Sequence, residues 1–276
     1  MTRFFKVSGS GNDFLALAEP SENPAPERIR AWCRRGVSLG ADGLFVLRRN
    51  HHDGGDGGAV TMDYFNADGL PADLCLNGTR CAAQLAFHLG WANGEVRVET
   101  AAGPVAARRL DAARVTLDLP TPAAAPREVT VEVEGVPYTG YHLVVGVPHF
   151  VLPWPGESLE GVPVEELGRP LRFHPAFGAP GANVNFVRFP ARQRMEIRTY
   201  ERGVEAETLS CGSGVLAAAA AGLWLGQSAL PLAVVTRGGF VLEVAGDPAT
   251  GRWSLSGDAR VVAHGDLLPG AALAQS

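Results

Sequence analysis

An internal repeat restricts the fold of this chain more than any other feature. Three pairs of landmarks recur at an offset of 136 residues (211 − 75 = 136): Asn12 to Leu15 with Pro148 to Val151, Cys75 with Cys211, and Val98 to Gly103 with Val234 to Gly239. A fourth pair, Gly40 to Val46 with Gly181 to Val187, recurs at 141. Landmarks that keep one order and nearly one spacing predict two copies of one fold.

Length and composition agree with two domains. The chain has 276 residues, 46% of them hydrophobic, which is enough to bury two cores of ordinary size. The proline-rich stretch from Leu119 to Pro126 predicts the linker. We therefore expect an N-terminal domain over residues 1–119 that carries Cys75 and a C-terminal domain over 120–262 that carries Cys211. Residues 263–276 form a tail that can return to the first domain.

Short segments rich in valine or aromatic residues and bounded by Gly or Pro predict strands at 43–49, 59–65, 94–100, 114–119 and 129–136. Helices are predicted at 26–35, 78–89 and 214–225, with a short helical turn at 164–167. Strands and helices are thus mixed in an α/β (α+β) fold. The His- and Gly-rich segment 51–58 is predicted to be a hairpin tip, because no helix N-terminus follows it to bind phosphate.

Charge and apolar patterning exclude several partners. A net charge of −5 without a Lys/Arg cluster argues against nucleic acid and anionic membranes as partners. The longest apolar run, Val215 to Leu225, is about half of the ~20 residues that a membrane span requires. The four cysteines form neither a CxxC pair nor a zinc spacing, so we expect no metal site and free thiols in a reducing, cytoplasmic compartment.

Cys75 and Cys211 share a setting that favours chemistry. Each follows a strand and a polar loop and comes directly before an alanine-rich helical run. The first N–H groups of a helix have no internal partner, so they stabilise a thiolate and also bind a carboxylate. Gly78, Gly212 and Gly214 allow a ligand to approach the backbone closely. We interpret Cys33 and Cys81, which lack this setting, as small buried residues.

Two such cysteines facing each other across a domain cleft suit racemisation or epimerisation. One thiolate removes a proton from a carbon, and one thiol returns a proton on the opposite face, so the two groups titrate as a coupled pair. A pyridoxal phosphate enzyme needs a lysine, and Lys6 in the opening strand is the only one, so we expect no cofactor. Two other readings are a binding protein without catalysis and a redox protein that forms a Cys75–Cys211 disulfide.

The chain resembles the diaminopimelate epimerases. The resemblance rests on the segments Gly9 to Phe14, Phe65 to Gly69, Cys75 to Cys81, Pro148-His149, Ala182-Asn183, Tyr200 to Gly203 and Cys211 to Gly214. It implies a cofactor-independent enzyme that interconverts L,L- and meso-diaminopimelate in lysine and cell-wall precursor synthesis. It also implies two similar domains, each a curved mixed or antiparallel sheet around a central helix, with the active site in the cleft between them.

The same resemblance assigns roles to single residues. Cys75 and Cys211 are the acid/base pair, and His149 and Glu201 assist proton movement. Asn12, Asn66, Asn183, Glu201 and Arg202 line the substrate pocket, and backbone N–H groups around Asn77, Gly78, Gly212 and Ser213 hold the reacting carboxylate. A substrate with two amino acid ends needs donors for a second carboxylate, which Arg202 and the asparagines supply. The partners expected are a small amino acid substrate and, in a homodimer, a second copy of the chain.

Three positions depart from the pattern of the family: Val147 where many members have asparagine, Leu76 in place of a glycine, and Gly43 in place of a glutamine. Valine neither donates nor accepts a hydrogen bond, so Val147 bears on how the distal end of the substrate is recognised. A racemase of another amino acid on the same two-cysteine scaffold is therefore the alternative. Arg202 discriminates the two, because a second carboxylate requires its guanidinium in the pocket.

Overall fold

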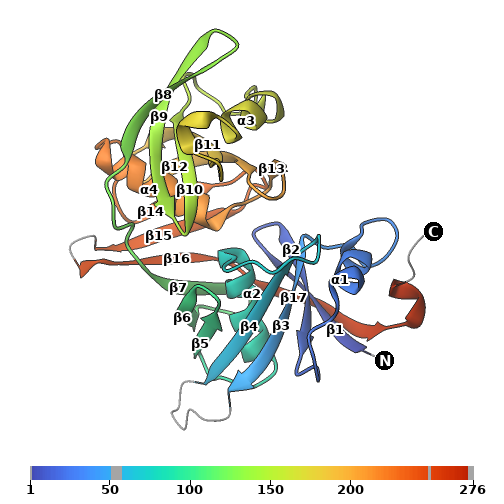
Figure 1. The fold of residues 1–276 in the computed structure, drawn as a ribbon. Coiled ribbons are helices and arrows are strands. Elements are labelled where there is room, and N and C mark those ends of the chain that lie inside the picture. The colour runs from blue at the N-terminus through green and yellow to red at the C-terminus, as the bar shows by residue number, and fades with distance from the viewer. Residues whose placement is uncertain (1, 51–57, 248–249, 273–276) are drawn as a thin grey trace. The chain divides into compact units, whose positions relative to one another are not determined.

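The structure is a computed structural model that describes residues 2–50, 58–247 and 250–272 and divides into two compact units (Figure 1). Unit 1 comprises Met1–Asp118 and Gly257–Ser276, and unit 2 comprises Leu119–Ser256. This division places residues 257–262 in unit 1, whereas the sequence-based domains placed them in the second. Of the predicted hairpin tip, residues 51–57 lie outside the described part of the chain.

Unit 1 is a mixed sheet with two α-helices. Hydrogen bonding joins its strands in the order β17-β1-β2-β3-β4-β5-β6-β7, with β2–β3 and β4–β5 parallel and the other pairs antiparallel. The elements are β1 (Thr2–Gly9), β2 (Asn12–Ala18), α1 (Pro26–Cys33), β3 (Gly43–Asn50), β4 (Ala59–Asn66), α2 (Leu76–His88), β5 (Glu95–Thr100), β6 (Gly103–Arg109), β7 (Arg114–Pro120), β17 (Arg260–Leu267) and the 3₁₀ helix η3 (Pro269–Ala272).

Unit 2 repeats this plan. Its strands follow the order β8-β9-β10-β11-β12-β14-β15-β16, with β10–β11 and β12–β14 parallel and the other pairs antiparallel, and β13 adds to β12. The elements are β8 (Arg127–Val133), β9 (Val136–Val145), β10 (Val147–Pro153), α3 (Val164–Arg172), η1 (Pro175–Phe177), β11 (Asn183–Ala191), β12 (Arg194–Glu201), β13 (Ala206–Thr208), α4 (Gly212–Trp224), β14 (Leu232–Val235), β15 (Val241–Asp247) and β16 (Arg252–Asp258).

Strand register confirms the repeat seen in the sequence. Phe14 of β2 pairs with Gly43 of β3, and Phe150 of β10 pairs with Val184 of β11. The first residues of these pairs are 150 − 14 = 136 positions apart and the second are 184 − 43 = 141 apart. The change of offset therefore comes from five extra residues in unit 2 between the two parallel strands, where α3 and η1 replace the single helix α1.

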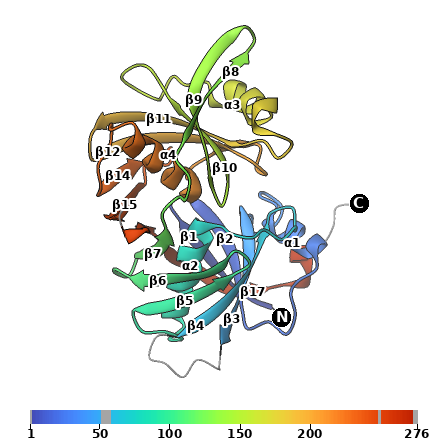
Figure 2. The same ribbon diagram turned by 60° about the vertical axis from the view of Figure 1, so that its left-hand side comes forward.

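The helices α2 and α4 lie at the centre of their units. Every residue of α2 from Leu76 to Phe87 is buried, and the helix contacts β17 and each of β1 to β6 (Figure 2). The helix α4 contacts β9 to β12 and β15. Both helices have 13 residues, and two residues after the last residue of each stands a glycine with positive φ, Gly90 (φ 71°) and Gly226 (φ 66°). Glycine adopts this conformation without strain and so terminates a helix.

Four predicted elements need correction. The helices α2 and α4 begin at Leu76 and Gly212, two residues before the predicted starts, because Cys75 and Cys211 themselves are the N-cap residues. The short turn predicted at 164–167 is the first part of α3, which continues through Pro170. The strand predicted at 129–136 spans the end of β8 and the start of β9. Glu134 and Gly135 both have positive φ (52° and 80°) and form the hairpin turn between them.

The last strand of the chain completes the sheet of the first unit. β17 pairs with β1 from Thr2↔Leu267 to Ser8↔Arg260. In unit 2 the corresponding place beside β9 is filled by β8, which precedes it in the chain. One strand of unit 1 is thus supplied from the opposite end of the sequence. Across the described residues, no helix is both long and apolar enough to cross a membrane.

Candidate active site

Cys75 caps α2 with its sulfur. The residue has extended backbone angles (φ −132°, ψ 107°), and Sγ accepts a hydrogen bond from the N–H of Gly78 at 3.4 Å. Asn12 places its Oδ1 at 3.9 Å from Sγ, and Asn77 donates from Nδ2 to the same Oδ1 at 3.4 Å. The structure thus brings Cys75, Asn12, Asn77 and Gly78 together at one helix N-terminus, where the helix dipole favours negative charge.

Asp42 fixes the start of β2, where Asn12 lies. The carboxylate Oδ2 of Asp42 accepts from Asn12 Nδ2 at 2.6 Å and from the N–H of Asp13 at 3.0 Å. Asp13 itself forms ion pairs with Lys6 and Arg35. Burial opposes ionisation of Asp13, but the hydrogen bonds from Arg35 and Lys6 outweigh it and lower its pKa. The Asn12 amide is therefore held in one orientation, with Oδ1 toward Cys75.

Asn66 ends β4 and shapes the turn that follows. Its N–H donates to the carbonyl of Leu70, and its carbonyl accepts from the N–H of Gly69, both at 2.9 Å. Within the described chain its half-buried side chain makes no hydrogen bond, so the amide is available to a ligand. The backbone of Asn66 therefore has the turn role that its sequence context suggests, and the amide keeps the predicted binding role as a proposal.

Cys211 occupies the equivalent position in unit 2. It precedes α4 with φ −122° and ψ 110°, is 6% exposed, and has Sγ at 3.5 Å from the hydroxyl of Ser213. A Cβ on Gly214 would overlap Oδ1 of Asn185 and would lie 3.3 Å from the sulfur of Cys211. Glycine at 214 is thus required by the protein's own packing and leaves no room there for a ligand.

His149 lies fully buried in β10 beside Asn185. The nitrogen Nδ1 is 3.2 Å from Nδ2 of Asn185, whose Oδ1 accepts from the hydroxyl of Thr199 at 3.0 Å. Because the amide oxygen faces a donor, the amide nitrogen donates to Nδ1, and the imidazole proton lies on Nε2. Burial lowers the pKa of His149 to about 3, with a smaller contribution from the charge of Arg202. The imidazole is therefore neutral at physiological pH.

Three predicted binding residues meet at the ends of β11 and β12. The Oδ1 of Asn183 accepts from the N–H of Arg202 at 2.7 Å, and Oε2 of Glu201 accepts from the hydroxyl of Thr208 at 2.8 Å. Asn183 therefore fixes the backbone of Arg202. In the described part of the chain the guanidinium of Arg202 makes no hydrogen bond or ion pair, which leaves it available to a substrate carboxylate.

Sequence reasoning missed Asn185 and Arg80, and the repeat could have found both. Asn185 corresponds to Leu44 at the offset of 141, and Arg80 corresponds to Leu216 at the offset of 136. A polar residue in one copy, where the other copy has leucine, indicates a position at which the polar group has a structural or functional role. Asn185 orients His149 and abuts Gly214. Arg80 donates to Asn77 from within α2.

Gly43, one of the departures from the family pattern, has a packing reason. A Cβ at this position would lie 2.6 Å from the carbonyl oxygen of Phe65 and 2.9 Å from the hydroxyl of Tyr64. Neither separation is tolerated, so a larger residue requires a shift of β4. Leu76, another departure, is the first residue of α2 and is 5% exposed. Gly43 and Leu76 are therefore consistent with ordinary packing of unit 1.

The only lysine of the sequence is engaged within unit 1. Lys6, the only lysine, forms an ion pair with Asp13 and donates to the carbonyl of Gly40, so it is not presented to a carbonyl ligand. Among residues 2–50, 58–247 and 250–272, no three His, Cys, Asp or Glu side chains are grouped to hold a metal ion.

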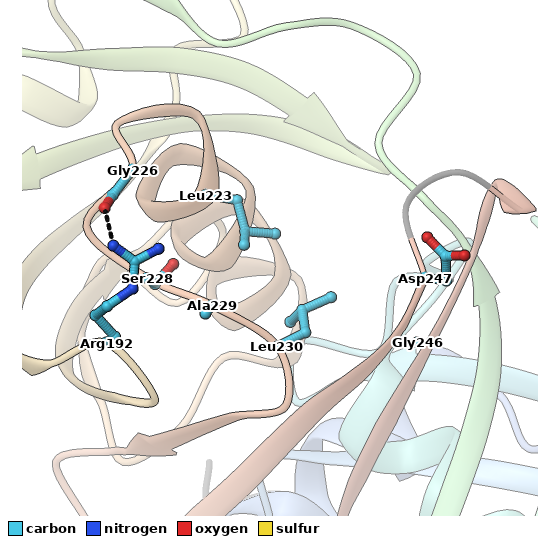
Figure 3. A pocket seen from close by; sticks show the side chains of 8 residues that line it. All are labelled: Arg192, Leu223, Gly226, Ser228, Ala229, Leu230, Gly246 and Asp247. Atoms are coloured by element: carbon cyan, nitrogen blue, oxygen red, sulfur yellow. Dashed lines mark hydrogen bonds between the residues drawn. The ribbon is translucent and has the colours of Figure 1, made fainter.

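A pocket of about 470 Å³ lies in unit 2 (Figure 3). Its lining comprises Arg192, Leu223, Gly226, Ser228, Ala229, Leu230, Gly246 and Asp247. Leu223 lies in the last turn of α4 and Gly226 follows the helix, and 13 residues of helix separate this end from Cys211 by roughly 20 Å. The pocket contains none of the predicted site residues, so we do not assign the chemistry to it.

Comparison with known proteins decides the family. The profile described as diaminopimelate epimerase matches residues 4–120 and again residues 141–262. The chain belongs to the diaminopimelate epimerase family. The two matched ranges correspond to the two copies of the repeat, and the expected family resemblance is confirmed.

Curated relatives agree over most of their length. The diaminopimelate epimerase of Aquifex aeolicus is 38% identical over 252 residues, which cover 87% of this chain and 88% of the relative. That of Methanothrix thermoacetophila is 37% identical over 265 residues, which cover 89% and 90%. These relatives confirm that the chain is an isomerase.

Solved structures share the fold at low sequence identity. A probable proline racemase from Agrobacterium radiobacter K84 matches with a TM-score of 0.72 at 15% identity, over 99% of this chain and 96% of that one. A hydroxyproline epimerase from Agrobacterium vitis matches with a TM-score of 0.67 at 16% identity, over 99% and 95%. The predicted α/β fold, with a mixed sheet in each of two domains, is therefore confirmed.

Proposed function

We propose that this member of the diaminopimelate epimerase family interconverts L,L- and meso-diaminopimelate by proton transfer at the α-carbon, with Cys75 and Cys211 as the two bases. The observation that carries the proposal is the capping position of both cysteines, each immediately before a central 13-residue helix. A sulfur at a helix N-terminus is stabilised as a thiolate at neutral pH, and a free cysteine elsewhere is mostly a thiol.

In the proposed reaction, one proton is removed from the α-carbon of the substrate and another proton is added to it. A thiolate takes the α-proton and becomes a thiol, and the electron pair is delocalised into the carboxylate as an enolate-like charge. The second cysteine, a thiol at that moment, donates its proton to the opposite face and becomes a thiolate. The N–H groups of Asn77, Gly78, Gly212 and Ser213 lie in the first turns of α2 and α4, where such donors stabilise the developing charge without reorganisation.

Polar side chains near the cysteines are proposed to recognise the rest of the substrate. Arg202 has an uncommitted guanidinium and binds the distal carboxylate, with Asn12, Asn66, Asn183 and Glu201 holding ammonium and carboxylate groups. His149 is neutral and is oriented by Asn185, and any proton that it passes on leaves from Nε2. Val147, at the start of β10, supplies apolar contact in place of a hydrogen bond.

Solvent deuterium incorporation tests the proposal. Reduced protein is incubated with L,L-diaminopimelate in D₂O, and the α-deuterium and the meso isomer are followed by NMR and mass spectrometry. Wild type is expected to incorporate deuterium and form the meso isomer, whereas Cys75→Ala and Cys211→Ala are expected to lose conversion by several orders of magnitude. Cys33→Ala is the matched control, since Cys33 is buried in α1 outside the site.

Each outcome has a clear meaning. Failure of wild type to exchange the α-proton of diaminopimelate refutes the substrate assignment, and exchange with another amino acid then supports the alternative racemase. Retained conversion in either single mutant refutes the two-base mechanism. Full activity after oxidation to a verified Cys75–Cys211 disulfide refutes it as well, because the disulfide removes both bases.

Location and assembly complete the proposal. A reducing cytoplasm keeps Cys75 and Cys211 as thiols, as the mechanism requires. We propose a cytoplasmic enzyme of lysine and cell-wall precursor synthesis that acts as a homodimer. Sedimentation at micromolar concentration measures the oligomeric state, and a single species with the mass of one chain, 29.0 kDa, would refute the dimer.

A further inference from the structure

Arg80 is a cation buried beneath the capping cysteine of unit 1. It lies in α2 five positions after Cys75, and its exposed fraction is 0%. The guanidinium Nη2 donates to Asn77 Oδ1 at 2.7 Å and to the hydroxyl of Ser10 at 3.1 Å, and Nε lies 3.5 Å from the carbonyl oxygen of Asp258. All of these acceptors are neutral.

The positive charge of Arg80 has no carboxylate partner. None of the described residues places a carboxylate oxygen within ion-pair distance of the guanidinium, and Nη1 has no hydrogen-bond partner. Burial accordingly lowers the pKa of Arg80. Arginine nonetheless stays protonated in proteins, so a buried and unpaired guanidinium favours negative charge in its surroundings.

The groups around Arg80 leave Cys75 as the anion to be stabilised. Burial raises the pKa of the Cys81 thiol, which is therefore neutral. The carboxylate of Asp258 accepts from the N–H of Ser10 at 2.6 Å and from Nε of Arg260 at 3.2 Å. Asp13 in β2 and Asp42 just before β3 both pair with Arg35, and Asp13 also pairs with Lys6. These carboxylates already have partners.

A chain of hydrogen bonds connects Arg80 to the position of the sulfur. Arg80 holds Asn77 Oδ1, Asn77 Nδ2 donates to Asn12 Oδ1 at 3.4 Å, and Asn12 Oδ1 lies 3.9 Å from Cys75 Sγ. The last contact favours the thiol, but it is a long contact to a neutral amide. A full positive charge and the N–H of Gly78, at 3.4 Å from Sγ, act in the opposite direction.

The second copy lacks this cation. At the equivalent position of α4, five residues after Cys211, stands Leu216 (216 − 80 = 136), which is 3% exposed. The Cys211 sulfur instead lies near the neutral hydroxyl of Ser213 at 3.5 Å. The two equivalent helices thus differ in the charge that is buried five residues after the cysteine.

We propose that Arg80 is a positioning residue that makes the two copies unequal: it stabilises Cys75 as the thiolate of the resting enzyme, and Cys211 rests as the thiol. The inference rests on the proposed two-base function. Cys75 then takes the α-proton from the isomer whose proton faces it, and Cys211 supplies the proton to the other face. The product leaves an enzyme with Cys75 protonated and Cys211 ionised, and exchange of one proton with water restores the resting form.

The test is the pH dependence of alkylation at each cysteine. Reduced wild type, freed of reductant, is treated with iodoacetamide from pH 5 to pH 10, and peptides containing Cys75 and Cys211 are quantified by mass spectrometry. Rates are normalised to their high-pH plateau, so that accessibility cancels and the midpoint reports the thiolate fraction. In wild type we expect the Cys75 midpoint to lie at least about one pH unit below that of Cys211.

Variants assign the difference to the guanidinium. Arg80→Leu, which gives the first copy the residue of the second, is expected to raise the Cys75 midpoint by about one unit or more. The Cys211 midpoint is not expected to rise, because the two thiols are coupled and a less ionised Cys75 repels the Cys211 thiolate less. Arg80→Lys keeps the charge and is expected to retain most of the low midpoint. Leu216→Ala, the matched change in unit 2, is expected to leave the Cys75 midpoint unchanged.

Two results overturn the inference. One is a Cys211 midpoint at or below that of Cys75 in wild type, which decides the matter even when the Arg80 variants do not fold. The other is folded Arg80→Leu with the wild-type Cys75 midpoint. Deuterium exchange on the same samples separates the two proposals: exchange with equal midpoints refutes only the role of Arg80, and a low Cys75 midpoint without exchange refutes only the epimerase.

Discussion

Acid sensitivity of unit 2 should come in large part from one histidine. The pKa of His149 is lowered from 6.5 to about 3 by burial. Between these two pH values the unfolded chain binds a proton that the folded chain does not, so stability is fully present above pH 6.5 and falls as pH drops toward 3. At pH 5, which lies 1.5 units below 6.5, the loss is about 2 kcal/mol (1.5 × 1.36).

The variant His149→Gln removes this titration. Free energies of unfolding are measured with guanidinium chloride at pH 7.5 and pH 5.0, and only the difference between the two pH values is compared, so that the general cost of the substitution cancels. Wild type should lose about 2 kcal/mol more than His149→Gln on acidification. His88→Gln, which removes an exposed histidine at the end of α2, is the control and should keep the wild-type loss. An equal loss in wild type and His149→Gln would refute a neutral, buried His149.

Three further predictions follow from packing and burial. Gly214→Ala places a methyl group against Asn185 and should destabilise the protein by about 1–3 kcal/mol. Gly78→Ala, the equivalent change at the offset of 136, meets the flexible end of Met62 at 3.1 Å and should cost less than about 1 kcal/mol. Equal shifts of the thermal midpoint in the two variants would contradict this. Arg198→Met leaves Arg237, at 3.8 Å, as the remaining ion-pair partner of the partly buried Glu207 carboxylate and removes the donor to the carbonyls of Leu159 and Val162, so it should cost about 1–3 kcal/mol. Arg188→Met, at a more exposed ion pair, should cost clearly less, and chemical denaturation of the two variants checks the ranking. Burial raises the pKa of Cys33 to about 12, so this thiol should stay unmodified by iodoacetamide at pH 8 under conditions that alkylate Cys75, and labelling of Cys33 in folded protein would refute its burial.

Some helices and strands could be predicted from the local sequence alone. The capped helices α2 and α4 follow from a cysteine after a polar loop, an alanine-rich run and a closing glycine, Gly90 or Gly226. The strands β3, β4 and β7 follow from short runs with valine or aromatic residues that are bounded by Gly or Pro. In these elements the residues that start and stop the element are themselves the signal, so the predicted bounds differ from the structure by two residues or fewer.

Other features depend on partners distant in the chain. The helix α3 contains Pro170, which in isolation predicts a break, and tertiary packing of Val164 and Leu171 in the core of unit 2 outweighs it. Asn185 reads as a strand residue, and only the folded sheet places its amide between His149 and Thr199. From the sequence alone, the charged side chain of Arg80 would be predicted to face solvent. Its burial depends on Ser10 and Asp258, which are 70 and 178 residues away.

The return of β17 to unit 1 has a consequence for how the protein is made. During synthesis the ribosome releases β1 to β7 long before Gly257, and until then β1 exposes the edge that β17 later covers. Unit 2 is complete as a contiguous segment and so can fold first, although it lies second in the chain. The backbone that holds Asp258 against Ser10 and Arg80 arrives in the same late segment. Maturation of the Cys75 site is thereby coupled to completion of the polypeptide, and nascent chains stalled before residue 257 should lack it.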